Sequence, residues 1–318
     1  MITSKQVTVT YVPADCGGII PGKCKAPRAF RDARLANKLD ATCRHKTQEQ
    51  MALDSSATFS IATFSPGGVR NEDLNVSVCQ AVQRALTENL EGRFAHNFQL
   101  IIGGECCMLP GILSAFWKYA ESLSPPRRVG LVYIDADTDL NSPRDPDSIG
   151  TFAGMNMAHL VRLPGALPSM QRFSRSSGEP VCDSSNTVFF GTNMSSPGNK
   201  PDHFKYLFDN NYKVVSSASV AKDPEQRARE TLDYLEGMVD VIMVHLDVDS
   251  IDPGTFPLAN VPNFTGVEFE VMMRALRVLL GSSKVAGLTV AEVNPDHDPS
   301  LVMVERLAIR IADMLGAR

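Results

Sequence analysis

The sequence lacks the features that mark membrane proteins and nucleic-acid-binding proteins. No window approaches the roughly 18 consecutive apolar residues that a membrane-spanning helix requires. Basic residues are not in excess either, because 31 Lys and Arg stand against 36 Asp and Glu, which gives a formal net charge of -5. Nucleic-acid-binding surfaces need clustered cations to displace counterions. We therefore expect no membrane and no nucleic acid among the partners of this protein.

Marks of export are also missing. Residues 1–13, MITSKQVTVTYVP, alternate polar and β-forming residues, whereas a secretory signal has an apolar core of roughly 7–15 residues. The seven cysteines are odd in number and irregularly spaced, at Cys16, Cys24, Cys43, Cys79, Cys106, Cys107 and Cys182. That pattern indicates reduced thiols and not a disulfide framework. We therefore predict a cytoplasmic location.

What the sequence does contain is an alternation of short β-branched runs with amphipathic helical patterns. This alternation is typical of a parallel sheet covered by helices on both faces. Strands are predicted at 6–12, 58–64, 98–104, 128–135, 187–191, 212–217, 240–247 and 284–293. The clearest helices are predicted at 74–90, 109–122, 223–237, 268–280 and 300–315. The Pro-, Ser- and Gly-rich stretches at 141–151, 164–185 and 195–202 are predicted to be long loops on one α/β domain that spans 1–318.

Acidic residues gather where two of the predicted strands end. The run RVGLVYID continues into Asp135, Asp137 and Asp139, and DVIMVHLD ends in Asp247 with Asp249 two residues later. Alternate side chains of an extended segment point to the same side, and ligands of parallel sheets bind beyond the carboxyl ends of the strands. Carboxylates held this close repel one another unless a cation lies between them. The pattern therefore predicts an oxygen-rich site for one or two divalent metal ions.

Two further strand ends carry residues that are capable of chemistry. The run FQLIIGG leads into Cys106, which can offer a thiolate, after a Gly-Gly pair that permits close approach of another backbone. Taken alone, such a cysteine indicates only a buried thiol. The run KVAGLTVAEV leads into Glu292. An acid there that binds no metal is available to hold a cationic substrate or to move a proton.

Four motifs together carry a resemblance to a known family. They are Gly-Gly-Glu-Cys at 103–106, YIDADTDLNSP at 133–143, HLDVDSIDP at 245–253 and AEVNPDHD at 291–298. Their order and spacing resemble the ureohydrolase superfamily of arginases, agmatinases and formiminoglutamases. The resemblance extends over nearly the whole chain, since Pro21-Gly22, Ala26-Pro27, Arg31 and the C-terminal helix also fit. It implies a three-layer arginase-like α/β fold, a mostly parallel eight-stranded sheet, and homo-oligomers that are trimers or hexamers.

The resemblance also implies a reaction. In this family a binuclear manganese site activates a bridging hydroxide, which attacks the amidine carbon of a guanidinium or a related C–N substrate. By position, Asp135 and Asp247 would bridge both metals, Asp139 would hold the first metal and Asp249 the second.

Contacts with a small-molecule substrate are implied in the same way. Glu292 matches the acid that holds the substrate guanidinium, and Asn141 falls where arginases contact the amino-acid end of the substrate. Asp139 and Glu292 are the candidate catalytic residues.

The two imidazole ligands of the family are absent from this sequence. Cys106 stands in the place of one, and Asp137 in the place of the other, so both replacements are candidate metal ligands. Five aspartates carry a charge of -5 and a Cys106 thiolate adds -1, whereas two His and four Asp carry -4. A water molecule bound there would be less acidified than in the family. Oxygen ligands and the resemblance favour Mn²⁺, while a thiolate favours the softer Zn²⁺ or Fe²⁺.

Other departures concern proton transfer and recognition. Ala153 stands where arginases place a proton-shuttling His, and Asn193-Met194 replace the Arg-Asp pair that supports amino-acid recognition. L-Arginine is therefore not the expected substrate. His159 and His297 are candidates to replace the shuttle, whereas His245 is interpreted as a core histidine and not as a ligand.

One motif competes with this interpretation. Residues 17–24, GGIIPGKC, nearly match the phosphate-binding pattern G-x-x-x-x-G-K-[ST]. Cys24 cannot supply the hydroxyl that ligates Mg²⁺, and Pro27 is expected to disturb the helix that should face the phosphate. Nucleotide binding is therefore disfavoured, and the resemblance implies that this segment is a loop near the mouth of the active site.

We therefore predict a metal-dependent hydrolase of a non-peptide C–N bond, acting on a guanidino, amidino or amide group of a small molecule. The alternative is a catalytically inactive arginase-fold protein that serves as a binding or assembly module. The loss of two His ligands and of the shuttle favours that alternative. Against it, both replacements are themselves metal-ligand types, and five carboxylates without a metal are costly to hold together.

Overall fold

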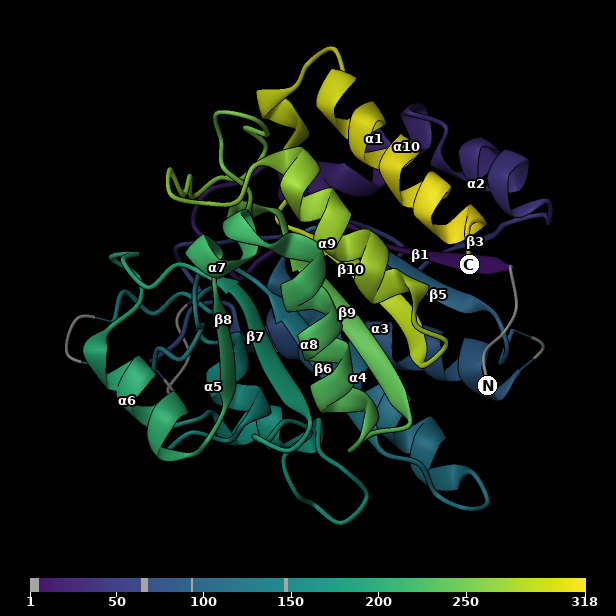
Figure 1. Ribbon diagram of the computed structural model, residues 1–318. Coiled ribbons are helices and arrows are strands. Elements are labelled where there is room, and N and C mark those ends of the chain that lie inside the picture. Colours follow the sequence, from purple (N-terminus) through teal and green to yellow (C-terminus); the bar gives the residue numbers. More distant parts are fainter. Residues whose placement is uncertain (1–5, 64–67, 93, 146–147) are drawn as a thin grey trace.

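One sheet of eight strands forms the centre of the molecule (Figure 1). The computed structural model describes residues 6–63, 68–92, 94–145 and 148–318. The strand order is β3-β1-β5-β10-β9-β6-β7-β8, and all neighbouring pairs are parallel. The strands are β1 Val7–Val12, β3 Gln48–Met51, β5 Phe98–Gly103, β6 Val129–Ile134, β7 Thr187–Thr192, β8 Lys213–Ser216, β9 Val241–Asp247 and β10 Val285–Ala291. The predicted eight-stranded parallel sheet is confirmed.

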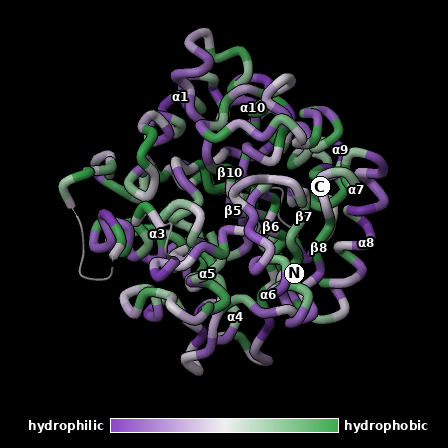
Figure 2. The backbone as a smooth tube through the Cα atoms, turned by 90° about the vertical axis from the view of Figure 1, so that its left-hand side faces the viewer, coloured by the Kyte–Doolittle hydropathy of each residue, from purple (hydrophilic) through white to green (hydrophobic). Residues whose placement is uncertain are grey.

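Helices cover both faces of this sheet, and Figure 2 shows the central strands enclosed between them. One face packs against α1 Ala26–Asp32, α2 Leu35–Cys43, α8 Pro224–Glu236, α9 Phe269–Gly281 and α10 Val302–Gly316. The other packs against α3 Glu72–Glu91, α4 Leu109–Ser122 and α5 Asn156–Leu160. The remaining helices are α6 Pro201–Asp209 and α7 Ser217–Lys222. These three layers make the three-layer α/β fold that the resemblance implies, and every residue of the inner strands β5, β6, β9 and β10 is buried.

The five helices predicted from periodicity are all present. The helix α4 has the predicted bounds, and α3, α8, α9 and α10 begin and end within two residues of theirs. Pro27 does not disturb α1, because it lies in the first turn of that helix, where proline is tolerated. In the part of the chain that the structure describes, no helix combines the length and the hydropathy needed to cross a bilayer.

The strand predicted at 58–64 is wrong. Only β4 Ala57–Thr58 forms there, and it pairs with β2 Ala14–Asp15 in a separate two-stranded sheet, while residue 64 lies outside the described residues. Its place in the main sheet is taken by β3, whose sequence is QEQM. This strand lies at the sheet edge with alternately half-buried and exposed residues. An edge strand of this kind carries no apolar run by which the sequence could reveal it.

Candidate active site

The sheet order brings the four strand ends that carry predicted site residues to one edge. The strands β5, β10, β9 and β6 are consecutive neighbours, and all run in the same direction. Cys106, Glu292 and Asp135 lie just beyond the carboxyl ends of β5, β10 and β6, and Asp247 is the last residue of β9. The residues there line a cavity of about 270 Å³, whose polar members include Lys23, Cys106, Asp135, Asp137, Asp139, Asp247, Asp249 and Glu292. All six predicted metal ligands and the predicted substrate acid therefore face one space.

Close approach of possible ligand atoms is confined to three overlapping groups among the described residues. Within each group the atoms lie within 4.8 Å of one another. The groups are Asp135 with Asp247 and Asp249, Cys106 with Asp247 and Glu292, and Cys106 with Asp135 and His245. Cys106, Asp135 and Asp247 each belong to two of these groups.

The same local turn orients the first aspartate on both strands. The backbone N–H of Asp137 donates to Asp135 Oδ1 at 2.7 Å, and that of Asp249 donates to Asp247 Oδ1 at 2.8 Å. The second oxygens of the two aspartates differ in their partners. Cys106 Sγ donates to Asp247 Oδ2 at 2.8 Å, whereas Asp135 Oδ2 is buried and has no partner among the described residues. A buried carboxylate oxygen without a partner is costly unless a ligand binds it.

Burial and mutual repulsion act on these carboxyl groups together. Burial, followed by the charges of neighbouring acids, raises the pKa of Asp135, Asp247 and Asp249 well above the ordinary value. Burial raises the pKa of Asp139 to about 7, although hydrogen bonds from Tyr133 and Asn156 oppose the rise. The cluster is therefore poorly suited to remain anionic by itself, and an oxygen-rich group of this kind fits a divalent cation.

Asp139 and Glu292 are both held in left-handed backbone conformations, with φ of 51° and 65°. Such conformations are unfavourable for residues with a side chain and are concentrated at functional sites. Tyr133 Oη donates to Asp139 Oδ2 at 2.6 Å, and Asn156 Nδ2 donates to the same oxygen at 3.2 Å. These bonds fix the Asp139 carboxylate at the cavity wall.

Lys23 lies in the segment 17–24, which was expected near the mouth of the site, and it lines this cavity with an exposed fraction of 3%. Its Nζ lies 2.9 Å from Glu105 Oε1 and 3.2 Å from Glu292 Oε2. Burial alone would lower the pKa of Lys23, but the charges of Glu292 and Glu105 outweigh it and raise the pKa. The lysine therefore stays charged and is bound by two carboxylates.

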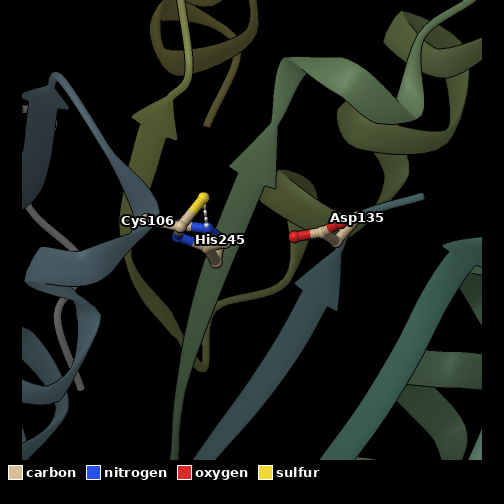
Figure 3. A group of neighbouring side chains, drawn as sticks. All are labelled: Cys106, Asp135 and His245. Carbon is tan, nitrogen blue, oxygen red and sulfur yellow. Dashed lines mark hydrogen bonds between the residues drawn. The ribbon is translucent and has the colours of Figure 1, made fainter. Parts of the chain in front are cut away.

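His245 contacts Cys106 directly, although the sequence analysis interpreted it as a core histidine. Its Nε2 lies 3.0 Å from Cys106 Sγ, and Figure 3 shows the two side chains meeting, with Asp135 on the neighbouring strand. The imidazole is fully buried and stacks on Tyr133, with ring centroids 5.1 Å apart. Burial lowers the pKa of His245 to about 3, so the ring is neutral near pH 7. Its position two residues before Asp247 is the sequence signal that places it on this side of the strand.

Comparison with known proteins tests the family resemblance that the four motifs carry. The family model described as "Arginase family" matches residues 5–316. The chain belongs to the arginase family. It is 26% identical to arginase-1 of Oryctolagus cuniculus over 305 residues, covering 92% of this chain and 86% of the relative.

Solved structures of the arginase family share this fold. The arginase of Bacillus caldovelox superposes with a TM-score of 0.84 at 20% identity, covering 98% of this chain and 99% of that one. Formimidoylglutamase of Bacillus subtilis subsp. subtilis str. 168 superposes with a TM-score of 0.71 at 16% identity, covering 98% and 87%. Within this arginase-family chain, the resemblance drawn from four motifs is confirmed at the level of family and fold.

Three residues discussed from the sequence lie outside the main cavity of this arginase-family protein. Asn141 lines a neighbouring cavity of about 240 Å³ that shares Ile149, Thr151 and Ala153 with the main one. His159 is buried against Phe152, and His297 is exposed. Neither histidine lines the main cavity.

Proposed function

We propose that this arginase-family protein hydrolyses a non-peptide C–N bond of a small molecule in a reaction that depends on one or two divalent metal ions. The observation that carries the proposal is the group formed by Asp135, Asp247 and Asp249, in which a buried oxygen of Asp135 has no hydrogen-bond partner in the described part of the chain. Proteins named for hydrolysis of arginine and formimidoylglutamate share the fold. The substrate is a guanidino, amidino or amide-bearing molecule other than L-arginine.

The residues divide into holders of metal and residues that contact the substrate. Asp135 and Asp247 would bridge two ions, with Cys106 and Asp139 completing one position and Asp137 and Asp249 the other. When bound, such ions supply Lewis-acid activation of water and of the bond that is cleaved. Mn²⁺ is the metal that the family suggests, and Zn²⁺ or Fe²⁺ is the alternative that Cys106 supports.

Other residues of the chain position the substrate and the ligands. Glu292 Oε1 accepts a hydrogen bond from the backbone N–H of Cys106 at 2.9 Å. This bond connects the acid proposed to contact the substrate with the short 3-10 helix that carries the Cys106 thiol. Asn141 contributes from the neighbouring cavity, where a longer substrate would extend.

We further propose that His245 joins Cys106 as a ligand, so that an imidazole from β9 replaces one that the family supplies after β5. The contact of 3.0 Å between His245 Nε2 and Cys106 Sγ supports this, as does Asp135 within the same group. His245 Nδ1 has no partner among the described residues, so the contact with Cys106 is the polar interaction that this ring makes. A thiolate with a neutral imidazole is a donor set that suits Zn²⁺ or Fe²⁺.

Two variants test this pair. We expect Cys106→Ser and His245→Phe each to weaken metal binding by more than the ~10–100-fold that the loss of an outer partner costs, because each removes a direct ligand. Phenylalanine keeps a ring against Tyr133 and so preserves the packing. Chelator competition measures the affinity, and X-ray absorption of the metal-loaded protein counts sulfur and imidazole neighbours.

The matched control is Cys107→Ser, because Cys107 is also buried but belongs to a separate apolar cluster with Val76 and Phe152. It should keep the affinity and the sulfur neighbour. An unchanged imidazole count in His245→Phe would restore the interpretation of His245 as a core histidine.

The function itself is tested by turnover. Purified protein, chelated and then supplied with Mn²⁺, Zn²⁺ or Fe²⁺, is offered guanidino, amidino, ureido and amide compounds, and release of ammonia, urea or amine is measured. Hydrolysis that requires the metal supports the proposal. Absence of hydrolysis in every combination would favour the inactive arginase-fold protein that serves as a binding or assembly module.

A further inference from the structure

The acid that would hold a cationic substrate already holds a cation from the chain itself. Glu292 Oε2 lies 3.2 Å from Lys23 Nζ, and Glu292 Oε1 accepts from the backbone of Cys106. Both oxygens of this carboxylate are therefore engaged. A guanidinium placed there would meet the ammonium of Lys23, and like charges in a desolvated contact repel strongly.

Lys23 is fixed in this place by a surrounding structure. Glu105 accepts hydrogen bonds from the backbone N–H groups of Gly17 and Gly18 at 2.6 and 2.8 Å, and its Oε1 also binds Lys23. A Cβ at Gly18 would lie 2.9 Å from Glu105 Oε1 and 3.1 Å from Lys23 Nζ, so glycine leaves the room that this arrangement needs. The loop, the buried acid and the lysine form one unit.

The mouth of the cavity is apolar. Four aliphatic side chains that line it are exposed to solvent by about half or more: Ile19 50%, Ile20 48%, Ile149 64% and Val261 58%. Among the described residues that line the cavity, Lys23 is the sole cationic one, and it is paired with two acids. Lys23 is therefore not free to bind a substrate carboxylate, while the rim offers apolar surface.

We propose that Lys23 occupies the place of a substrate cation beside Glu292, and that the substrate carries a neutral amide or ureido head on an apolar substituent. This inference rests on the proposed function and selects among the substrate groups named there. Lys23 is then a specificity-determining residue, since its charge disfavours guanidinium and amidinium heads.

A neutral carbonyl head can accept a hydrogen bond from the remaining N–H donor of Lys23. An ammonium has three N–H donors, and the two ion pairs of Lys23 account for two of them. The third can donate to the carbonyl oxygen of the substrate. In the hydrolysis, one water is consumed, its oxygen bonds to the carbonyl carbon, the C–N bond breaks, and a proton goes to the departing nitrogen.

The test uses two probes of the same size, N-pentylurea and pentylguanidinium, which differ in that the neutral carbonyl of the urea is replaced by a cationic amidinium group. Binding is measured by titration calorimetry on the protein as purified and after addition of Mn²⁺. We expect the wild type to favour the urea by about 100-fold, because like charges that meet without water oppose binding. Lys23→Met, of similar length and without charge, should reverse the preference, since Glu292 is then unpaired. Lys23→Arg retains a cation and should retain the preference for the urea.

A third probe tests the rim. L-Citrulline carries the ureido head on a charged amino-acid tail and should bind at least about tenfold more weakly than N-pentylurea, because the mouth offers apolar surface and Lys23 is already paired.

Stronger binding of pentylguanidinium than of the urea by the wild type, an unchanged preference in Lys23→Met, or no binding of either probe would each overturn the inference. Melting curves establish that the variants fold, and Lys23→Gln replaces Lys23→Met if the latter does not. Calorimetry needs no turnover, so a protein that binds the urea but hydrolyses nothing would contradict the proposed function and leave the inference standing.

Discussion

Replacing Asp247 with Asn should remove metal from both positions and reduce metal-dependent turnover to background. Asp247 belongs to two of the three groups of close ligand atoms, and it accepts the hydrogen bond from the Cys106 thiol. Asn keeps the shape of the side chain but lacks the negative charge that a bridging ligand contributes. Metal content per chain after dialysis, together with turnover, measures the effect.

A matched substitution separates the loss of a metal ligand from general disturbance of the segment that follows β9. Asp252→Asn changes an acid five residues further on, which accepts a bond from the backbone of Gly254 and does not line the cavity. That variant should retain its metal. Loss of one metal with retention of the other in Asp247→Asn would show that Asp247 is a ligand of a single ion.

Replacing Glu292 with Gln should leave the metal content unchanged while turnover falls by about 10²–10⁴-fold, the range for loss of a group that handles a proton or positions the reacting molecule. The reason lies in its contacts. Glu292 binds Lys23 and the backbone of Cys106, and it follows β10 in a left-handed conformation at the cavity wall. Metal analysis and turnover on the same preparation measure the two effects together.

The control for this variant is Glu305→Gln, which alters a partly exposed ion pair with Lys38. Neither residue of this pair lines the cavity, so the variant should change neither quantity. Glu292 also lies in one group of possible ligand atoms with Cys106 and Asp247. If the Gln variant loses metal, Glu292 is a ligand and the division between metal holders and substrate contacts is wrong.

The inner strands of the sheet could be predicted because parallel strands that are buried on both faces consist of nearly continuous apolar residues. The strands β5, β6, β9 and β10 have this form, and the acids that follow them mark the edge at which ligands bind. The polar strand β3 has no such run, and its pairing with β1 depends on a tertiary neighbour that local sequence does not reveal. The sequence therefore predicts the strands at the centre of the sheet but not the strand β3 at its edge.

The candidate site divides in a similar way. Strand-end residues such as Asp135 and Glu292 could be predicted because the direction of a parallel sheet brings them together. The resemblance placed the segment 17–24 near the mouth of the site, but the ion pair of Lys23 with Glu105 could not be predicted, because it joins two segments that are far apart in sequence. The spacing to Asp247 placed His245 on the correct side of its strand. Its contact with Cys106 could not be predicted, because that contact depends on how far the two side chains extend toward each other.

The measurement that tests the central claim most directly is the metal content of protein purified without added metal, combined with melting before and after chelation. The account predicts one to two divalent ions per chain, because Asp135, Asp137, Asp139, Asp247 and Asp249 share one cavity. A ligand present at 100 times its Kd stabilises the folded state by about 2.7 kcal/mol, so chelation should lower the melting temperature by several degrees. Metal-free protein whose melting temperature is unchanged by added Mn²⁺, Zn²⁺ or Fe²⁺ and by chelation would contradict the account.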